Sequence, residues 1–261
     1  MLPVLCIESL RLCYGTHCAV EQLSLEVWPR EVFGLLGPNG SGKSSTLSAI
    51  IGTHAPCAGH IRVMGYSEAD EPLEYRRQIG LVPQDLALYE ELSARQNLTF
   101  FGKLYGIYGR TLQQRVEEVL EFIQLRDWAD RSTRTFSGGM KRRLNLGCAL
   151  LHKPRLLLLD EPTVGIDIQS REAIFSALRY LRDSGSALVF TTHHLEEAEQ
   201  LCDRVGIMDQ GRLLALGTID ELSRDYDTLP TGWRLDGPHE SVAGLRLERV
   251  FLELTGRSLR E

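Results

Sequence analysis

Residues Gly37 to Ser44 have the types and spacing of a phosphate-binding loop. They read Gly-Pro-Asn-Gly-Ser-Gly-Lys-Ser and match the pattern Gly-x-x-x-x-Gly-Lys-Ser. The glycines let backbone N–H groups turn toward a polyphosphate without an intervening side chain. Lys43 supplies a compact cation for the outer phosphates, and the Ser44 hydroxyl can ligate magnesium.

The segments that flank this loop are those that must position it. Residues 31–36 predict a buried strand, and residues 45–51 predict a helix that Gly52 closes. With both flanks on the correct sides, a chance match in a Gly/Ser-rich turn is the weaker alternative. The residues expected to bind the phosphates are Gly37, Pro38, Asn39, Gly40, Ser41, Gly42, Lys43, Ser44 and Ser45.

Two carboxylates follow a second apolar run. Residues 155–160 predict a central strand buried on both faces, and Asp160 and Glu161 stand at its C-terminal end. At that edge Asp160 would hold magnesium, and Glu161 would polarise a water for in-line attack on a γ-phosphate. Taken alone, a strand that ends in a charged turn is an equal interpretation, and the loop at 37–44 favours the chemical one.

A second anion-binding pattern precedes another helix. Ser137, Gly138 and Gly139 open a helical stretch over residues 141–151, where free N–H groups, a hydroxyl and the helix dipole would coincide. By itself this pattern could be only an N-cap and a turn. The chain would then carry two anion-binding sites but only one carboxylate pair. This mismatch is explained if the second site binds a nucleotide held by another copy of the chain.

Together these motifs resemble the nucleotide-binding subunit of an ATP-binding-cassette (ABC) transporter. The resemblance covers about residues 4–220 and is specific, because the Ser-Gly-Gly signature upstream of Asp-Glu is absent from most proteins that carry the loop alone. The segments at 83–89, 163–167 and 191–205 resemble the branch that exports drugs, lipids or polysaccharides. In family order the motif residues are Tyr14, the loop at 37–44, Gln84, Ser137 to Gly139, Asp160 and Glu161, Asp167 and His193.

The resemblance implies roles around the bound nucleotide. Tyr14 would stack on adenine, and Gln84 would join Ser44 and Asp160 at magnesium and sense a membrane partner. Tyr14 could also be an ordinary strand aromatic, and Gln84 could simply begin a loop. Magnesium, with ATP as the substrate, is the implied cofactor.

The resemblance also implies roles in catalysis and in the second copy. Glu161 would be the catalytic base, Lys43 would act on the phosphates, and His193 would hydrogen-bond the γ-phosphate. His193 could instead be an ordinary strand-end histidine. Asp167 would couple two sites at a subunit junction. The signature residues Ser137, Gly138 and Gly139 would contact ATP bound to the opposing subunit.

The implied partners are a second copy of the chain, ATP and integral membrane permease subunits, at the cytoplasmic face of the inner membrane. A net charge of −6 and a pI of about 5.7 argue against nucleic acid. One alternative is an ABC ATPase without a transport role, which usually has tandem cassettes, zinc-binding cysteines or basic extensions. Another is a GTPase or small-molecule kinase, which would leave Ser-Gly-Gly unexplained.

Three residues depart from the family pattern without touching the phosphate chemistry. Phe136 replaces a leucine, Gln96 replaces a glutamate near the expected partner surface, and Ile168 replaces a proline after Asp167. The cysteines, at 6, 13, 18, 57, 148 and 202, have no Cys-x-x-Cys spacing and predict reduced, mostly buried thiols.

The predicted fold is α/β, a P-loop NTPase (RecA-like) core with an antiparallel β layer and an inserted α-helical subdomain. An ATPase domain is expected over 4–220, with its core at 4–88 and 152–220 and the helical subdomain at about 89–151. In that subdomain apolar residues from 112 to 123 recur at helical spacing. A C-terminal extension over 221–261 is expected to be irregular at 222–242 and helical at 247–256. No run of about 18 apolar residues exists, so no membrane crossing is expected, and no secretion signal is evident at the start.

Overall fold

The computed structural model describes residues 2–226 and 245–256. These residues form two compact units. The first unit contains residues 2–5, 27–30 and 62–188, and the second contains residues 6–26, 31–61 and the described residues from 189 onward.

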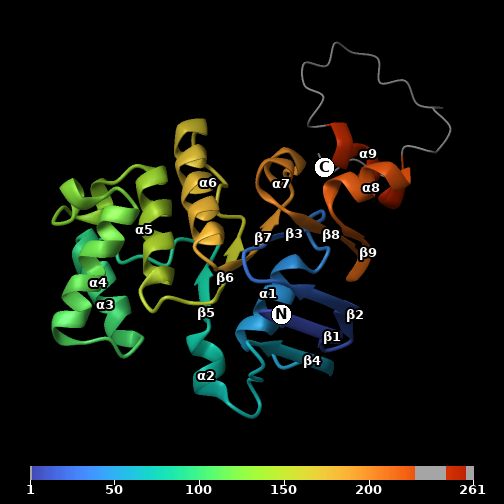
Figure 1. Cartoon of the computed structure of the whole chain (residues 1–261), viewed down its shortest axis with the longest axis horizontal. Coiled ribbons are helices and arrows are strands. Elements are labelled where there is room, and N and C mark those ends of the chain that lie inside the picture. Colours follow the sequence, from blue (N-terminus) through green and yellow to red (C-terminus); the bar gives the residue numbers. More distant parts are fainter. Residues whose placement is uncertain (1, 227–244, 257–261) are drawn as a thin grey trace. The chain divides into compact units, whose positions relative to one another are not determined.

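Three helices of the first unit pack side by side around an apolar core (Figure 1). They are α3 (Ala94–Leu104), α4 (Gly109–Phe122) and α5 (Gly138–Leu150), and the 3₁₀ turns Arg126–Trp128 and Thr133–Thr135 connect α4 to α5. The predicted stripe is confirmed, because its members are all buried in this core: Leu112, Val116, Val119, Leu120 and Ile123.

The start of α3 explains why one departure from the family pattern is tolerated. Ser93 and Gln96 form a capping box, in which each side chain bonds the backbone of the other. The Gln96 side-chain oxygen accepts from Ser93 N at 2.9 Å, the contact that a glutamate would make. Glutamine at position 96, in place of the glutamate of the family pattern, therefore removes a charge and keeps the helix cap.

The first unit also contains two parallel strands whose C-terminal ends meet. Strand β5 (Ile79–Val82) pairs with β6 (Leu156–Asp160), and Val82 lies opposite Leu159. All four leucines of β6 are buried, as predicted for a central strand. Helices α2 (Pro72–Arg77) and α6 (Ile168–Asp183) complete this unit.

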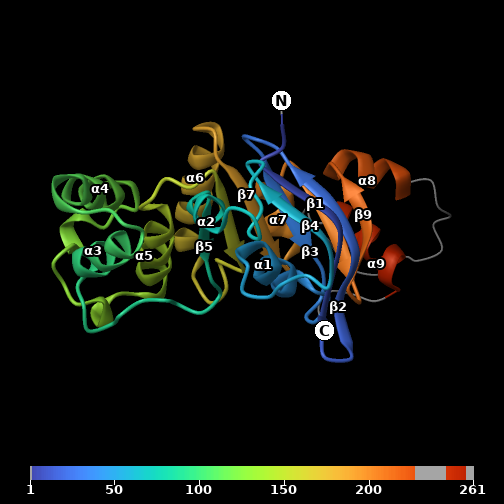
Figure 2. The same ribbon diagram turned by 90° about the horizontal axis from the view of Figure 1, so that it is seen from below.

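The second unit begins with a three-stranded sheet in the order β2-β1-β4 (Figure 2). Strands β1 (Leu5–Tyr14) and β2 (His17–Val27) are joined by two residues, a connection that only antiparallel strands allow. Strand β4 (Ala58–Val63) lies on the other side of β1. This is the predicted antiparallel layer.

A second sheet of this unit supports the phosphate loop. Strand β3 (Val32–Leu36) is buried along its whole length and runs into the loop, after which α1 (Lys43–Ile51) begins. Strand β8 (Arg204–Asp209) pairs with β3 in parallel and with β9 (Arg212–Gly217) antiparallel. Most of β7 (Ala187–Thr192) belongs to this unit, and β7 neighbours β3.

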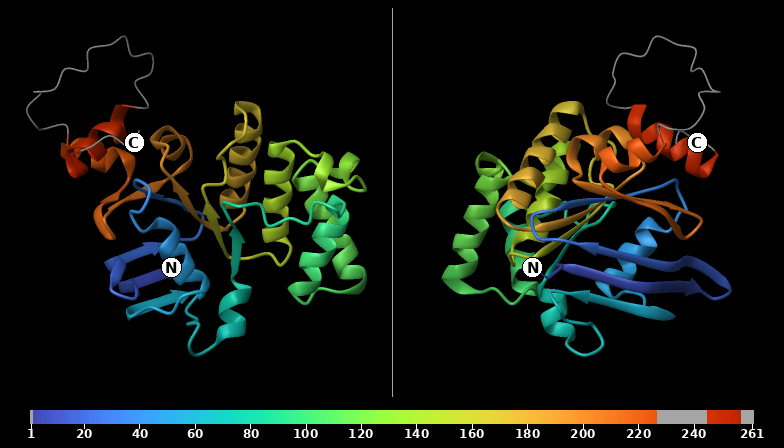
Figure 3. Two further views of the ribbon diagram at one scale, coloured as in Figure 1. Left: turned by 180° about the vertical axis from the view of Figure 1, so that it is seen from behind. Right: turned by 45° about the vertical axis from the view of Figure 1, so that its right-hand side comes forward.

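Helices α8 (Ile219–Tyr226) and α9 (Leu245–Thr255) lie side by side near the end of the chain (Figure 3). The prediction of irregular structure is wrong for residues 222–226, which are helical in α8. The rest of that prediction, at 227–242, lies outside the described residues.

Helix α9 is held by its apolar face and by its first turn. Leu247, Val250 and Phe251 are buried, and Glu199 on α7 (Leu195–Leu201) accepts from the Leu247 backbone N–H at 2.8 Å. Over residues 2–226 and 245–256, no helix combines the length and apolar character that a bilayer crossing needs.

Candidate nucleotide-binding and catalytic site

The phosphate loop of the second unit has its shape because two glycines stand where no other residue fits. A Cβ at Gly37 would lie 2.2 Å from the Met208 carbonyl oxygen. Gly42 has φ +106, and a Cβ there would lie 2.5 Å from the Ala19 carbonyl oxygen. The backbone therefore approaches its neighbours closely, and glycine-rich backbone of this kind can turn N–H groups toward an anion.

Polar groups inside this loop suit a phosphate ligand. The Lys43 ammonium folds over the loop and donates to the carbonyl oxygens of Gly37 at 2.8 Å and Pro38 at 3.0 Å. Within the described residues, the buried Ser41 hydroxyl has no hydrogen-bond partner. Gly42 begins α1 without a capping side chain, so the positive end of the helix dipole faces the loop.

In the first unit the structure brings Gln84 and Glu161 together. Glu161 follows β6, is 7% exposed, and has the left-handed φ of +44 that side chains rarely adopt. Gln84 follows the parallel neighbour β5, and its Nε2 donates to Glu161 Oε2 at 3.4 Å. Asp160 ends β6 and is half-buried. Strained backbone of this kind concentrates at functional sites, which fits a catalytic carboxylate.

The signature residues form the N-terminus of α5. Ser137 is the N-cap, and its hydroxyl accepts from Met140 N at 3.3 Å. Ser137 and Gly138 are exposed, whereas Gly139 is buried against α6. A Cβ at Gly139 would lie 2.0 Å from Ser170 Oγ, so this glycine is required by packing.

Asp167 is the N-cap of α6. Its two carboxylate oxygens accept from the Ser170 backbone N–H and hydroxyl, both at 2.8 Å. These hydrogen bonds lower the pKa of Asp167. Ile168, one of the departures from the family pattern, is 71% exposed, and the Asp167 cap begins α6 without a proline.

His193 and Tyr14 belong to the second unit. His193 follows β7, which neighbours β3, the strand that leads into the phosphate loop. The ring centroids of His193 and His194 lie 4.1 Å apart. Tyr14 ends β1, is 40% exposed, and contacts the His54 ring edge-on with centroids 4.8 Å apart. Nothing in the sequence indicated His54, because 40 positions separate it from Tyr14.

Two cysteines beside Tyr14 are bonded to each other. The prediction of reduced thiols is wrong for Cys13 and Cys18, which form a disulfide. The short turn between β1 and β2 places the two residues side by side on neighbouring strands, a pairing that spacing alone did not indicate. Of the free cysteines, Cys148 and Cys202 are buried, and burial raises the pKa of both thiols.

The parallel strands, the glycine-shaped loop and the strand-end carboxylates define a P-loop nucleotide hydrolase. The ABC transporter family model matches residues 20–164. The chain is 47% identical, over 82% of its length and 69% of the relative, to the linearmycin resistance ATP-binding protein LnrL of Bacillus subtilis (strain 168). It therefore belongs to the ABC transporter family.

Two further comparisons cover almost the whole chain. The chain is 40% identical to a Nod factor export ATP-binding protein I of Cupriavidus metallidurans, with 100% of both proteins aligned. A solved structure described as the ATP-binding subunit of an ABC transporter has a TM-score of 0.82 at 31% identity, covering 97% of this chain and 99% of that one. The predicted fold and the predicted ATPase subunit of an export-type ABC transporter are thus confirmed.

Proposed function

We propose that two copies of this subunit close around two molecules of Mg-ATP, hydrolyse them, and reopen to drive separate membrane subunits. The observation that carries the proposal is the exposed N-terminus of α5, with Ser137 as its cap. It is a second anion-binding helix end, and the chain contains one phosphate loop. A two-fold dimer would let each copy present this end to the nucleotide held by the other.

The residues present fit a magnesium-bound triphosphate. The orphaned Ser41 hydroxyl and the cradle around Gly37 are suited to phosphate oxygens. Ser44, Gln84 and Asp160 offer oxygen donors, which magnesium prefers, and would hold it together with the phosphates. Bound there, magnesium would neutralise charge that develops on the β- and γ-phosphates.

Hydrolysis would proceed by in-line attack of water on the γ-phosphorus. Glu161 accepts a proton as the water oxygen bonds phosphorus, the bond to the β-phosphate oxygen breaks, and ADP and inorganic phosphate leave. Lys43 compensates the charge of the outer phosphates. His193 would hydrogen-bond the γ-phosphate, and Gln84, whose amide donates to Glu161, would join the magnesium and sense the membrane partner.

Loss of the γ-phosphate would release the second copy. Ser137, Gly138 and Gly139 would contact that phosphate across the dimer, and Asp167 would lie at the junction between the two pockets. The adenine would stack on Tyr14, whose ring is partly exposed. Closure by ATP and opening after hydrolysis form a phosphate-dependent switch.

Permease subunits would dock on the exposed apolar surface around α3. Contiguous patches of large apolar side chains are uncommon on a protein surface unless a partner covers them. The rings of Tyr89 and Phe100 are in edge contact with their centroids 4.9 Å apart, and Leu104 is 67% exposed. Docking there would hold the subunit at the cytoplasmic face of the membrane. One relative is named for Nod factor export, and two others are named for resistance to linearmycin and daunorubicin; these names support export as the proposed direction. The domain boundaries at 88, 151 and 220 stay a prediction.

The proposal is tested with Glu161→Gln. This variant should bind ATP, form a dimer in size-exclusion chromatography at millimolar Mg-ATP, and release phosphate more than about 100-fold more slowly than the wild type. Unchanged steady-state hydrolysis would remove Glu161 from the base role. A variant that binds ATP and stays monomeric would contradict the two-copy sandwich.

A further inference from the structure

Helix α5 contacts the segment that carries Gln84 through two side chains one turn apart. Arg142 Nη1 donates to the Gln84 backbone carbonyl oxygen, and Asn145 Nδ2 donates to the Pro83 carbonyl oxygen at 3.3 Å. Asn145 is 2% exposed, so its amide lies inside the protein. The backbone that follows β5 is therefore tied to α5 at two successive peptide groups.

The same arginine reaches a second loop. Arg142 Nη2 donates to the Val164 carbonyl oxygen at 3.2 Å. Val164 closes a turn on Glu161, because its N–H donates to the Glu161 carbonyl oxygen at 3.3 Å. One guanidinium thus joins the backbone of Gln84 to the turn that begins at Glu161. These are the two residues whose side chains meet at 3.4 Å.

The chemistry of arginine suits this bridge. Its planar fork presents several N–H donors in fixed directions, so it can bond two carbonyls that belong to different loops. Arg142 is partly buried, and burial lowers its pKa while the charge of Asp85 opposes that shift. Two carbonyl oxygens that accept from a charged donor make a stronger tie than neutral hydrogen bonds.

We infer that Arg142 is a positioning residue for hydrolysis, which holds the Gln84 amide against Glu161 and links this pair to the helix that Ser137 begins. The inference rests on the proposed function. Because α5 is one rigid helix, a shift of Gln84 would move Arg142 and, with it, the α5 N-terminus. A movement of Gln84 in one pocket would therefore displace Ser137 at the α5 N-terminus, which would face the nucleotide of the other copy.

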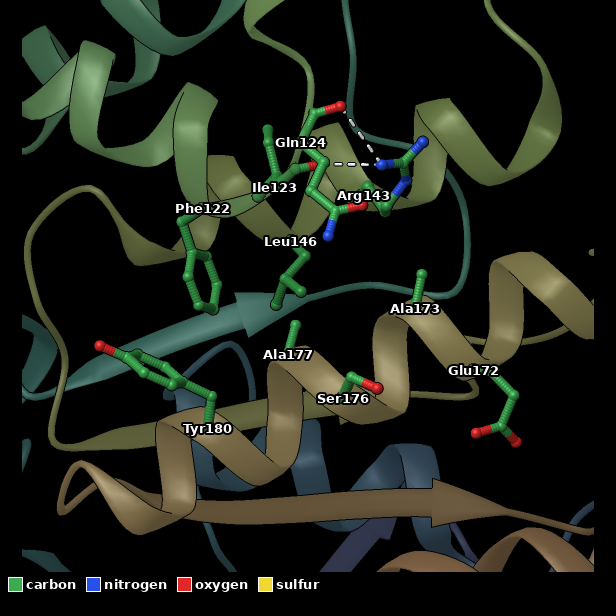
Figure 4. A pocket seen from close by; sticks show the side chains of 10 residues that line it. All are labelled: Phe122, Ile123, Gln124, Arg143, Leu146, Glu172, Ala173, Ser176, Ala177 and Tyr180. Atoms are coloured by element: carbon green, nitrogen blue, oxygen red, sulfur yellow. Dashed lines mark hydrogen bonds between the residues drawn. The ribbon is translucent and has the colours of Figure 1, made fainter.

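A matched control lies at the next residue of the same helix. Arg143 Nη1 also donates to two backbone carbonyls, Ile123 at 3.0 Å and Gln124 at 3.4 Å, and burial lowers its pKa as well. Figure 4 shows these two bonds at the edge of a hollow of about 380 Å³, which α6 lines with Tyr180. Arg143→Ala therefore removes a similar tie and leaves Gln84 untouched.

The first test compares Arg142→Ala with Arg143→Ala in the full chain. Phosphate release at saturating Mg-ATP should fall about 10- to 100-fold in Arg142→Ala, with KM within about threefold, and less than about threefold in Arg143→Ala. Hydrogen–deuterium exchange of the nucleotide-free protein should become faster at residues 82–90 in the first variant alone. Equal kcat in both variants, or unchanged exchange at 82–90, would overturn the inference.

A second pair of variants separates positioning from folding. Arg142→Lys keeps the charge without the planar fork, so its kcat should fall between those of the wild type and the alanine variant. In a Gln84→Ala background, Arg142→Ala should lower kcat by a further factor below about three, because its effect passes mainly through Gln84. A lysine variant with wild-type kcat, or fully multiplicative losses, would contradict the bridge. Absence of hydrolysis in the wild type would instead refute the proposed function, and the exchange measurement would still judge Arg142.

Discussion

The packing of Gly139 against α6 gives a prediction whose size follows from the structure. In Gly139→Ala the new Cβ would lie 2.0 Å from Ser170 Oγ and 2.5 Å from Ser170 Cβ. Rotation of the hydroxyl can clear the first contact, but the second involves an atom fixed to the backbone. The helices α5 and α6 must therefore separate, and overpacking of this kind costs about 1–3 kcal/mol.

The neighbouring glycine provides the control. A Cβ at Gly138 would meet nothing closer than the Gly165 carbonyl oxygen at 3.8 Å. Gly138→Ala should be neutral or stabilising by up to about 1 kcal/mol, because alanine favours a helix. The free energy of unfolding, from urea titrations followed by circular dichroism, measures both variants. Equal stabilities of Gly138→Ala and Gly139→Ala would refute the close-packing argument.

A compensating change tests whether Ser170 is the obstacle. Ser170→Gly removes both clashing atoms, with a loss of about 1 kcal/mol for glycine in a helix. The double variant Gly139→Ala/Ser170→Gly should then be within about 0.5 kcal/mol of Ser170→Gly alone. A full additional loss in the double variant would locate the clash elsewhere.

Further predictions concern the disulfide, the α6 cap and the partner surface. Unfolded without reductant, the protein should have four titratable thiols, and reduction should expose two more, from Cys13 and Cys18; six thiols without reductant would exclude the bond. Because hydrogen bonds lower the pKa of Asp167, its ionised form stabilises the fold above the ordinary aspartate pKa, and this stability is lost as pH falls through the lowered value. Asp167→Ala should therefore be less stable than the wild type at pH 7, with a gap in urea midpoint that narrows on acidification; a constant gap would contradict this. Leu104→Glu should abolish co-purification with detergent-solubilised permease, while Leu73→Glu, at a similarly exposed leucine on α2, should retain it; equal capture would move the docking surface elsewhere.

Most of the fold was predictable because its signals are local. The buried strand before Gly37, the buried strand before Asp160 and the apolar stripe from 112 to 123 each show their period within one segment. Helix α2 and strand β5 span six and four residues, too few to show a period, and they were not predicted.

The motif spacing predicts the members of the site, whose roles stay a prediction, but it does not predict the contacts between them. The motif spacing identifies Lys43 and Glu161 because their chemistry depends on local backbone. The bond from Gln84 to Glu161 spans 77 positions, and the fit of Gly139 against Ser170 depends on how two helices pack. No sequence pattern indicated Arg142. Its two partners are backbone carbonyl oxygens, which every residue carries, so residue types do not reveal these contacts.

The claim that each nucleotide pocket is shared between two copies is tested most directly by mixing two inactive variants. Lys43→Ala lacks a working phosphate loop, and Ser137→Arg lacks a working signature, so each homodimer should be inactive. In a mixed dimer, one pocket combines the intact loop of one copy with the intact Ser137 of the other. With random pairing, about half of the dimers are mixed and each has one working pocket, so the mixture should recover about a quarter of wild-type ATP hydrolysis. A mixture of folded variants that stays inactive, or a Ser137→Arg protein with wild-type activity alone, would contradict the account.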